Sequence, residues 1–392
     1  MPPALRLGLY YAAIFVGTGV SLPFMPVWFQ AHGMSGAAIG VLMSAPMLVR
    51  IVSGPAMAVW ADGFTLRRTP MVLLGLGAGL AFAVIGLTRG FTPWLIAWLV
   101  GSSLLATLPP LADVMTLRAA RTGGFTYGWP RGIGSLAFVC GNLIMGAMLS
   151  LKVPVDAVIV WISLAALLAA LLARAVLPPQ PVHESGERQH RRDRWRGLSR
   201  LMTNRPFLLA VGSAALIQAT HAFYYLFSAI LWRRQGISDM LIGILWATGV
   251  AAETAFMWFL EPWRRRVGPE MLLIIGGVAA LIRWTAFAFS PPLWALFPLQ
   301  ALHALSFTAT FLGSLPLIER LAPRESASAA QTLSSALSGG LLIGLASIAS
   351  GPLFDAVGAS GYLAMSGLTV VGLVGAVALY RRGRVNTSER PI

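Results

Sequence analysis

The sequence predicts an all-α membrane protein of twelve transmembrane helices, arranged as two pseudo-symmetric six-helix bundles. The first observation is composition: 57% of the 392 residues are hydrophobic and only 11% are charged, whereas a soluble globular domain carries roughly 25% charged residues. The second is hydropathy, because apolar runs of about 20 residues, long enough to cross a bilayer, recur along the whole chain. In lipid a helix satisfies its own backbone polar groups, so each run predicts a spanning helix.

The apolar runs fall into two sets of six, separated by the longest polar stretch. The predicted spans are 7–31, 38–60, 70–88, 94–116, 128–150, 155–177, 206–232, 240–260, 270–289, 293–318, 326–350 and 360–380. Residues 1–177 then form an N-terminal six-helix bundle, and residues 206–381 form a C-terminal one. A basic cytoplasmic linker, 178–205, joins the bundles, and residues 382–392 form a cytoplasmic tail.

The net charge of +15 is interpreted as a sign of which loops lie in the cytoplasm rather than as a nucleic-acid-binding surface. Of the 29 basic residues, Arg50, Arg131 and Arg283 lie inside spans, four fall on one side of the membrane, and the others fall on the opposite side or, as Arg174 does, at the span end that faces it. Loops rich in Lys and Arg remain in the cytoplasm. Both termini are therefore predicted to be cytoplasmic, in a bacterial-type inner membrane, with membrane lipid around the protein and no nucleic-acid partner. For the linker arginines, contact with lipid headgroups is an alternative to a purely connecting role.

The cysteine content and the N-terminal segment exclude further classes of protein. The single cysteine, Cys140, lies inside a predicted span, so no disulfide framework is expected. The first apolar run is too long for the core of a signal peptide and is interpreted as the first span. We find no metal-ligand cluster, phosphate-binding loop or nucleophile motif, which argues against an enzyme.

The two predicted halves repeat a pattern in the same loop. The segment DGFTLRR at 62–68 follows span 2, and EPWRRR at 261–266 follows span 8. Two six-helix halves related in this way resemble the major facilitator superfamily. The first loop resembles the signature of that superfamily, although Gly63 and Thr65 replace its usual basic residue and glycine. The resemblance implies that Asp62, Arg67 and Arg68 form a conformational latch; simple anchoring of the topology is the alternative.

Charged residues inside the predicted spans are few, and each is costly in lipid unless it is paired or hydrated. The candidates among them for a functional role are Arg50, Asp113, Arg131, Glu253 and Arg283. Further polar or titratable side chains in the spans are Asn142, His221, Tyr224, Tyr225, Gln300, His303 and Gln331. Acids and bases of this kind are expected to face a shared aqueous cavity between the halves.

The segment YGWPRGIGSLAF at 127–138 resembles the start of span 5 in lactose permease and its relatives. The resemblance implies that Asp113 and Arg131 clamp the polar end of a substrate and that Phe138 stacks against it. Arg131 and Phe138 are two helical turns apart and share a face. A guanidinium fork and a flat aromatic plate suit a ring that carries hydroxyls or a carboxylate. The alternative is an interfacial anchor in which Arg131 pairs with Asp113.

The second half also resembles lactose permease. Glu253, Arg283 and His303 fall at the positions of its acid in span 8, its arginine in span 9 and its histidine in span 10, which implies a proton-coupling and binding network. Ser306 stands where that family places a proton-carrying glutamate. Coupling is therefore expected to rest on Glu253 or on His303, or to be absent. The alternatives are a static ion pair of Glu253 with Arg283, and a packing role for His303.

Several short segments resemble the phenylpropionate permease family, a bacterial branch near lactose permease. They are HAFYY at 221–225, LWATGVAAE at 245–253, RW at 283–284 and QALHALSF at 300–307. In this resemblance Tyr224, Gln300 and His303 are expected to contribute to substrate binding.

These features predict a secondary active transporter that works by alternating access, with no cofactor and no metal. The expected reaction is proton-coupled symport of a small organic solute, such as a phenylpropionate-like aromatic carboxylate, by a monomer with the proton as coupling ion. Three alternatives remain open at this point: proton symport of a sugar or nucleoside, drug efflux by antiport and, from a different class, a non-transporting membrane sensor.

Overall fold

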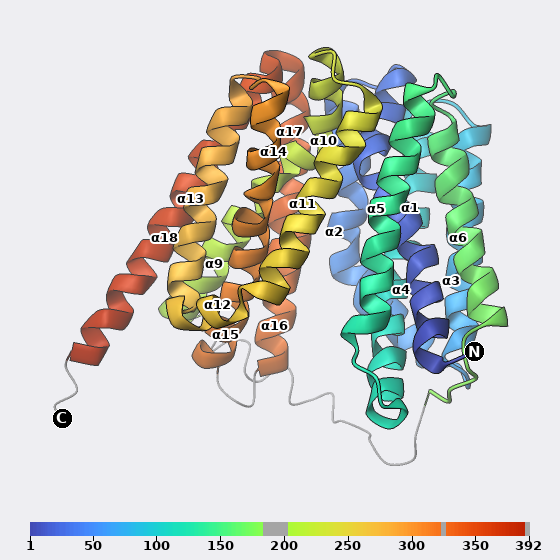
Figure 1. Ribbon diagram of the computed structural model, residues 1–392, viewed down its shortest axis with the longest axis horizontal. Coiled ribbons are helices and arrows are strands. Elements are labelled where there is room, and N and C mark those ends of the chain that lie inside the picture. Colours follow the sequence, from blue (N-terminus) through green and yellow to red (C-terminus); the bar gives the residue numbers. More distant parts are fainter. Residues whose placement is uncertain (183–202, 323–326, 389–392) are drawn as a thin grey trace. The chain divides into compact units, whose positions relative to one another are not determined.

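The computed structural model describes residues 1–182, 203–322 and 327–388, and helices account for nearly all of the ordered elements (Figure 1). The first half contains six long helices. They are α1 (Pro3–Ala31), α2 (Gly36–Ala61), α3 (Arg68–Leu87), α4 (Phe91–Gly123), α5 (Gly128–Ser150) and α6 (Ala157–Ala175). Ser35 begins α2 as its N-cap, since its hydroxyl accepts the backbone N–H of Ala38 at 3.2 Å.

The second half contains more, and shorter, helical elements, because several spans are interrupted. They are α9 (Arg205–Ala219), α10 (His221–Arg234), α11 (Asp239–Phe259), α12 (Glu261–Val267), α13 (Pro269–Ala288), α14 (Leu293–Ala301), the π-helix η1 (Ala304–Ala309), α15 (Thr310–Leu321), α16 (Ala327–Ala336), the π-helix η3 (Leu337–Leu342), α17 (Ile343–Val357), the 3-10 turn η4 (Gly358–Gly361) and α18 (Tyr362–Ser388). The two π-helices lie inside predicted spans 10 and 11, where a hydropathy pattern predicts continuous α-helix.

Eleven helical stretches of the described chain are long and apolar enough to cross a membrane. The last of them, Leu333–Arg382, contains most of predicted span 11 and the whole of span 12, which η4 separates. Predicted span 4 is longer than expected, since α4 runs from Phe91 to Gly123. The prediction of an all-α membrane protein is confirmed.

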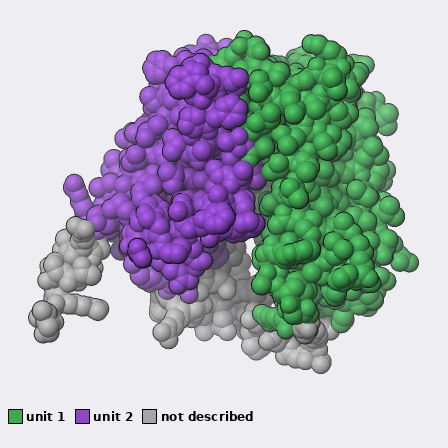
Figure 2. All heavy atoms as spheres, in the orientation of Figure 1, with its two compact units in different colours: residues 1–187, 226–247 green, residues 188–225, 248–392 purple. Residues whose placement is uncertain are grey.

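By their internal contacts, the described residues form two compact units (Figure 2). Unit 1 comprises residues 1–187 together with 226–247, and unit 2 comprises 188–225 together with 248–392. The division into bundles 1–177 and 206–381 remains a prediction. Within unit 1, Gly146 of α5 and Gly243 of α11 each approach the backbone of the other helix, so residues 226–247 group with the first unit. Most of the linker 178–205, including all its arginines except Arg205, and the last residues of the tail 382–392 lie outside the described residues.

In unit 1 the helices α1 and α5 cross at backbone contact, and this crossing places Arg131 and Phe138. A Cβ on Gly19 of α1 would collide with the carbonyl oxygen of Phe138. A Cβ on Gly141 of α5 would lie 2.6 Å from the carbonyl oxygen of Val16. Real Cβ atoms do not approach that closely, so both glycines are required by the packing.

Gly141→Ala is expected to lower the free energy of unfolding by about 1–3 kcal/mol, because a methyl group at this crossing forces the two backbones apart. The shift is measured as the midpoint of thermal unfolding in detergent micelles. Gly132→Ala in the same helix is the matched control, since a Cβ there has nothing within 4 Å. That control is expected to be neutral or slightly stabilising. Equal stability of the two variants would contradict the close crossing.

Candidate functional site

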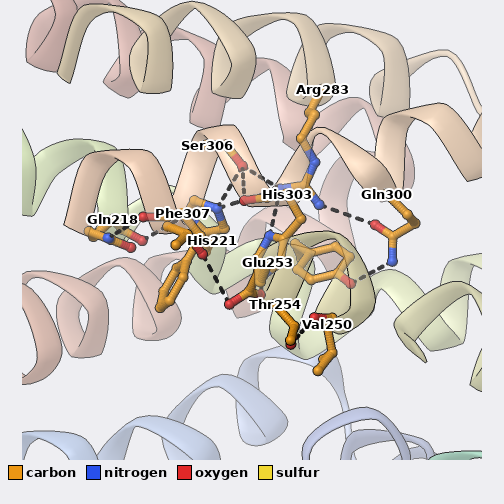
Figure 3. Close-up of polar contacts among 12 residues, drawn as sticks. Gln218, His221, Val250, Glu253, Thr254, Arg283, Gln300, His303, Ser306 and Phe307 are labelled. Carbon is orange, nitrogen blue, oxygen red and sulfur yellow. Dashed lines mark hydrogen bonds and ion pairs between the residues drawn. The ribbon is translucent and has the colours of Figure 1, made fainter. Parts of the chain in front are cut away.

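A buried polar cluster occupies the interior of unit 2 (Figure 3). Its side chains come from four membrane-length helical stretches: His221 and Tyr224 from α10, Glu253 from α11, Arg283 from α13, and a run that begins in α14 and ends in η1. The run contributes Gln300, His303, Ser306 and Thr308. The structure therefore brings the predicted residues Tyr224, Glu253, Arg283, Gln300 and His303 together.

Arg283 is at the centre of this cluster and is completely buried. One terminal nitrogen donates to Nδ1 of His303 at 2.9 Å and to Oγ of Ser306 at 2.7 Å. The other donates to Oε1 of Gln300 at 3.1 Å. In the described part of the chain, no carboxylate lies within ion-pairing distance of Arg283, and its Nε atom has no hydrogen-bond partner. The cation is thus held by neutral groups alone.

Aromatic rings surround the same guanidinium. Its Cζ atom lies 4.6 Å from the ring centroid of Trp284, 5.1 Å from that of Tyr224 and 5.6 Å from that of Phe287. Rings at these distances attract a cation through their negative faces. The amide of Gln300 orients one of them, since its Nε2 donates to the hydroxyl of Tyr224 at 2.8 Å.

His303 connects the cation to an acid. Its Nε2 lies 3.0 Å from Oε1 of Glu253. A guanidinium only donates hydrogen bonds, so Nδ1 of His303, which faces Arg283, must be an acceptor. The hydrogen-bond network therefore assigns a neutral His303 with its proton on Nε2, donated to Glu253. The alternative of a direct ion pair between Glu253 and Arg283 is wrong, because the imidazole lies between them.

His221 takes the opposite tautomer. Its Nδ1 donates to the backbone carbonyl of Gln218 at 3.1 Å. Its Nε2 is left as the acceptor, 3.2 Å from Oγ of Ser306 and 3.5 Å from Arg283. Both imidazoles thus present an unprotonated nitrogen to one guanidinium. Ser306, which replaces an expected glutamate, contacts both His221 and Arg283.

Unit 1 holds the remaining predicted binding residues in a second cluster. Asp113 of α4 accepts the hydroxyl of Tyr11 at 2.5 Å and the hydroxyl of Tyr127 at 2.9 Å. The guanidinium of Arg131 lies 4.3 Å from the ring centroid of Phe15 and 5.4 Å from that of Tyr11. These interactions place the ring of Tyr11 in contact with both charges.

Arg131 and Asp113 form no direct ion pair in the described part of the chain, so that alternative is wrong. Phe138 is half-buried on α5, two turns beyond Arg131. Tyr11, Phe15 and Thr116 were not predicted as site residues, although the hydroxyl of Thr116 donates to that of Tyr11 at 3.3 Å. A signal was present, since residues four apart in a predicted span share one face, as Tyr11 and Phe15 do.

Tyr11→Phe is expected to lower the free energy of unfolding by about 1–3 kcal/mol, because the buried side of Asp113 loses a donor. Thermal unfolding of the purified protein measures the difference. Tyr10→Phe is the control: Tyr10 is equally buried on α1, and its hydroxyl has no hydrogen-bond partner in the described structure. Removal of that hydroxyl is expected to be neutral or stabilising. Equal effects of the two variants would refute the assigned role of Tyr11.

Two arginines of the predicted latch contact the first residues of the linker. The guanidinium of Arg67 donates to the carbonyl of Val182 at 2.6 Å, and its backbone N–H donates to the carbonyl of Gln180 at 2.9 Å. Arg68 donates to the carbonyl of Leu177 at 3.5 Å. Residues 67 and 68 at the start of α3 therefore bind the segment that follows α6, which includes the start of the linker.

The acids of the two matching loops lie in different settings. Asp62 is exposed and ends α2 as its C-cap. Glu261 begins the short helix α12 and accepts two hydrogen bonds from Arg265, at 3.0 and 2.6 Å. The Arg265 guanidinium holds the pKa of the Glu261 carboxyl below its usual value. The repeated sequence pattern thus gives a loop in one half and a helix in the other.

A helical membrane fold that encloses a chain of buried ionisable groups is typical of transporters. The chain belongs to the MFS_1 like family, whose model matches residues 4–364, within the major facilitator superfamily. This confirms the predicted fold and superfamily. The protein is a transporter that moves a small molecule, not an enzyme.

Two curated relatives match nearly the full length. The chain is 28% identical over 384 residues to the probable 3-phenylpropionic acid transporter of Escherichia coli (strain K12), covering 97% of each. It is 29% identical over 386 residues to the maltose permease of Geobacillus stearothermophilus, covering 97% of this chain and 96% of that one.

Solved structures support the fold. The nucleoside transporter NupG has a TM-score of 0.85 at 16% identity, covering 97% of this chain and 99% of that chain. A bacterial homolog of the human lysosomal transporter Spinster has a TM-score of 0.71 at 16% identity, covering 96% and 95%. At these identities the likeness concerns the fold alone.

Proposed function

We propose that this protein is a proton-coupled symporter of small organic acids that works by alternating access. The observation that carries the proposal is the chain from the partly buried Glu253 through the buried His303 to the fully buried Arg283, inside membrane-spanning helices. Ionisable groups at such a depth are retained for transport or proton movement rather than for stability. In this proposal the protein is a monomer of the inner membrane with both termini in the cytoplasm.

The coupling step follows from the two ends of this chain. With Glu253 ionised, its charge balances Arg283 through the neutral imidazole of His303. When Glu253 takes up a proton, it no longer needs the donor on His303, and the cation on Arg283 loses its compensating charge. An anionic substrate restores the balance, so proton and anion are expected to bind together. A proton or a substrate anion that enters a low-dielectric interior alone carries an uncompensated charge at a high cost. This cost favours transport of the proton and the anion together.

The setting of Arg283 supports an anionic substrate. The fully buried cation of Arg283 is held by His303, Ser306 and Gln300 and has no carboxylate in direct contact in the described part of the chain. The rings around Arg283 and Arg131 offer flat apolar surfaces beside a cation, which suits an aromatic carboxylate. The likeness to a probable 3-phenylpropionic acid transporter supports the same class.

A sugar is the second candidate, because the chain is equally similar to a maltose permease. The carboxylate of Asp113 and the amide of Gln300 are groups that bind sugar hydroxyls. A neutral sugar would leave Arg283 without a counter-charge when Glu253 is protonated, so the cation favours the acid.

The test is substrate-driven proton movement with the purified protein in liposomes that contain a pH-sensitive dye. The probes are 3-phenylpropionate, maltose and a nucleoside, each added without an imposed gradient. Acidification inside the liposomes with 3-phenylpropionate alone supports the proposal, and the same response with maltose alone supports the sugar. Substrate uptake that ignores an imposed proton gradient would refute proton coupling. Ligand-induced thermal stabilisation without any flux would point to a sensor.

A further inference from the structure

The π-helix η1 lies in the wall of the buried cluster, directly after His303. In an α-helix two residues five positions apart point about 140° away from each other. The wider i→i+5 turn of a π-helix brings such residues onto nearly the same face. His303 and Thr308 are separated by five positions, and η1 covers Ala304–Ala309 between and around them.

Both residues contact one carboxylate. Nε2 of His303 lies 3.0 Å from Oε1 of Glu253, and the hydroxyl of Thr308 donates to Oε2 at 3.1 Å. Each oxygen of Glu253 therefore receives one donor from the same helical turn. Thr254, the residue next to Glu253, differs, because its hydroxyl donates to the carbonyl of Val250 in its own helix at 3.0 Å (Figure 3).

The packing of α13 accommodates the π-turn. A Cβ on Gly276 would collide with the hydroxyl oxygen of Thr310 and would lie 3.1 Å from the carbonyl oxygen of Leu305. The hydroxyl of Thr310 in turn donates to the carbonyl of Ser306 at 2.9 Å, which supplies a backbone partner within the widened turn. Glycine at 276 thus leaves the space that the wide turn needs.

We propose that Thr308 is a positioning residue for Glu253, seated by the π-turn, and that it sets the pH at which this acid takes up its proton. A hydroxyl that donates to a carboxylate favours the ionised form. Loss of the hydroxyl therefore lets Glu253 protonate at higher pH. This inference rests on the proposed function for the role of that proton, whereas the titration itself depends only on the contact. The titratable and charged groups around Glu253 come from α10, α13 and the α14–η1 junction: Tyr224, Tyr225, Arg283 and His303.

The experiment is an infrared titration of the purified protein without substrate. The carboxyl band of Glu253 is assigned by its absence in Glu253→Gln. Thr308→Val keeps the shape of the side chain and removes the hydroxyl. In this variant the pH midpoint of the Glu253 carboxyl band is expected to rise by about 0.5–1 pH unit, which corresponds to one lost hydrogen bond. Thr308→Ser is expected to restore the wild-type midpoint. Thr254→Val, next to the same acid, is expected to leave it unchanged.

A Thr308→Val midpoint equal to that of the wild type would overturn the inference, as would an equal shift in Thr254→Val. Thr308→Ala provides a second hydroxyl-free variant should the valine protein fail to fold. In liposomes, the pH profile of uptake is expected to move with the infrared midpoint. Wild-type protein that transports without moving protons would refute the proposed function, while the infrared comparison would still decide the role of Thr308.

Discussion

Glu253→Gln is expected to abolish substrate-driven proton uptake, and the variant is expected not to accumulate substrate against its concentration gradient. Glutamine has nearly the same shape, and its amide oxygen still accepts from His303 or Thr308, whose donors lie 3.0 and 3.1 Å from the carboxylate. The amide cannot titrate, so the cycle loses its proton carrier while the helices keep their packing. Exchange of labelled for unlabelled 3-phenylpropionate across the liposome membrane is expected to persist, because exchange needs no net movement of protons.

The control for this variant is Glu261→Gln. Glu261 is exposed in α12 and pairs with Arg265 on the same short helix, and such surface pairs contribute little. Its proton-coupled uptake is expected to equal that of the wild type. Proton flux that survives in Glu253→Gln would contradict the assignment of the coupling proton to this acid and would direct attention to His303.

Arg283→Lys is expected to lower the affinity for an anionic substrate by about ten- to a hundred-fold, which corresponds to the loss of one charged hydrogen bond. The guanidinium reaches His303, Ser306 and Gln300 at once because its donors spread in a planar fork. A lysine ammonium is a single point, so it cannot reproduce these contacts together. Binding is measured as the concentration of 3-phenylpropionate that stabilises the protein against heat.

The comparison is with Arg320→Lys. Arg320 pairs with Glu270 at the end of α15, where the side chain is exposed and a lysine is expected to serve equally well. If Arg283→Lys bound the anion as tightly as the wild type, Arg283 would not be part of the binding site, and the positive charge of Arg131 in unit 1 would become the candidate.

Hydropathy predicts the spans well because few backbone conformations are stable in lipid. A segment without water must satisfy its own backbone, so length and apolar composition already imply helices over ranges such as 128–150 and 270–289, close to the observed α5 and α13. Charge inside the spans is equally informative. Burial of a charge is so costly that the positions of Glu253 and Arg283 within apolar runs already mark them as candidates, and their place in one cluster with His303 agrees with that expectation.

The sequence does not show which side chain each buried charged group contacts, because these contacts join residues that are far apart in the chain. The positions of Asp113 and Arg131 suggest an ion pair. In the structure, the hydroxyls of Tyr11 and Tyr127 donate hydrogen bonds to Asp113, and the guanidinium of Arg131 packs against the ring of Phe15. Nothing in the spacing of charges reveals which neutral groups lie nearer. Helix α1, from the other end of the half, supplies Tyr11 and Phe15.

Composition and segment length suffice to show that this chain crosses a membrane many times and keeps a few ionisable groups inside, since the cost of polar groups in lipid leaves no other solution. Which of those groups meet depends on the packing of helices against one another. The π-turn is the clearest case: a periodicity of 3.6 residues places Thr308 away from His303, and only the widened turn, with Gly276 leaving room for it, aims both at Glu253. Local propensity cannot encode a turn that neighbouring helices hold in place.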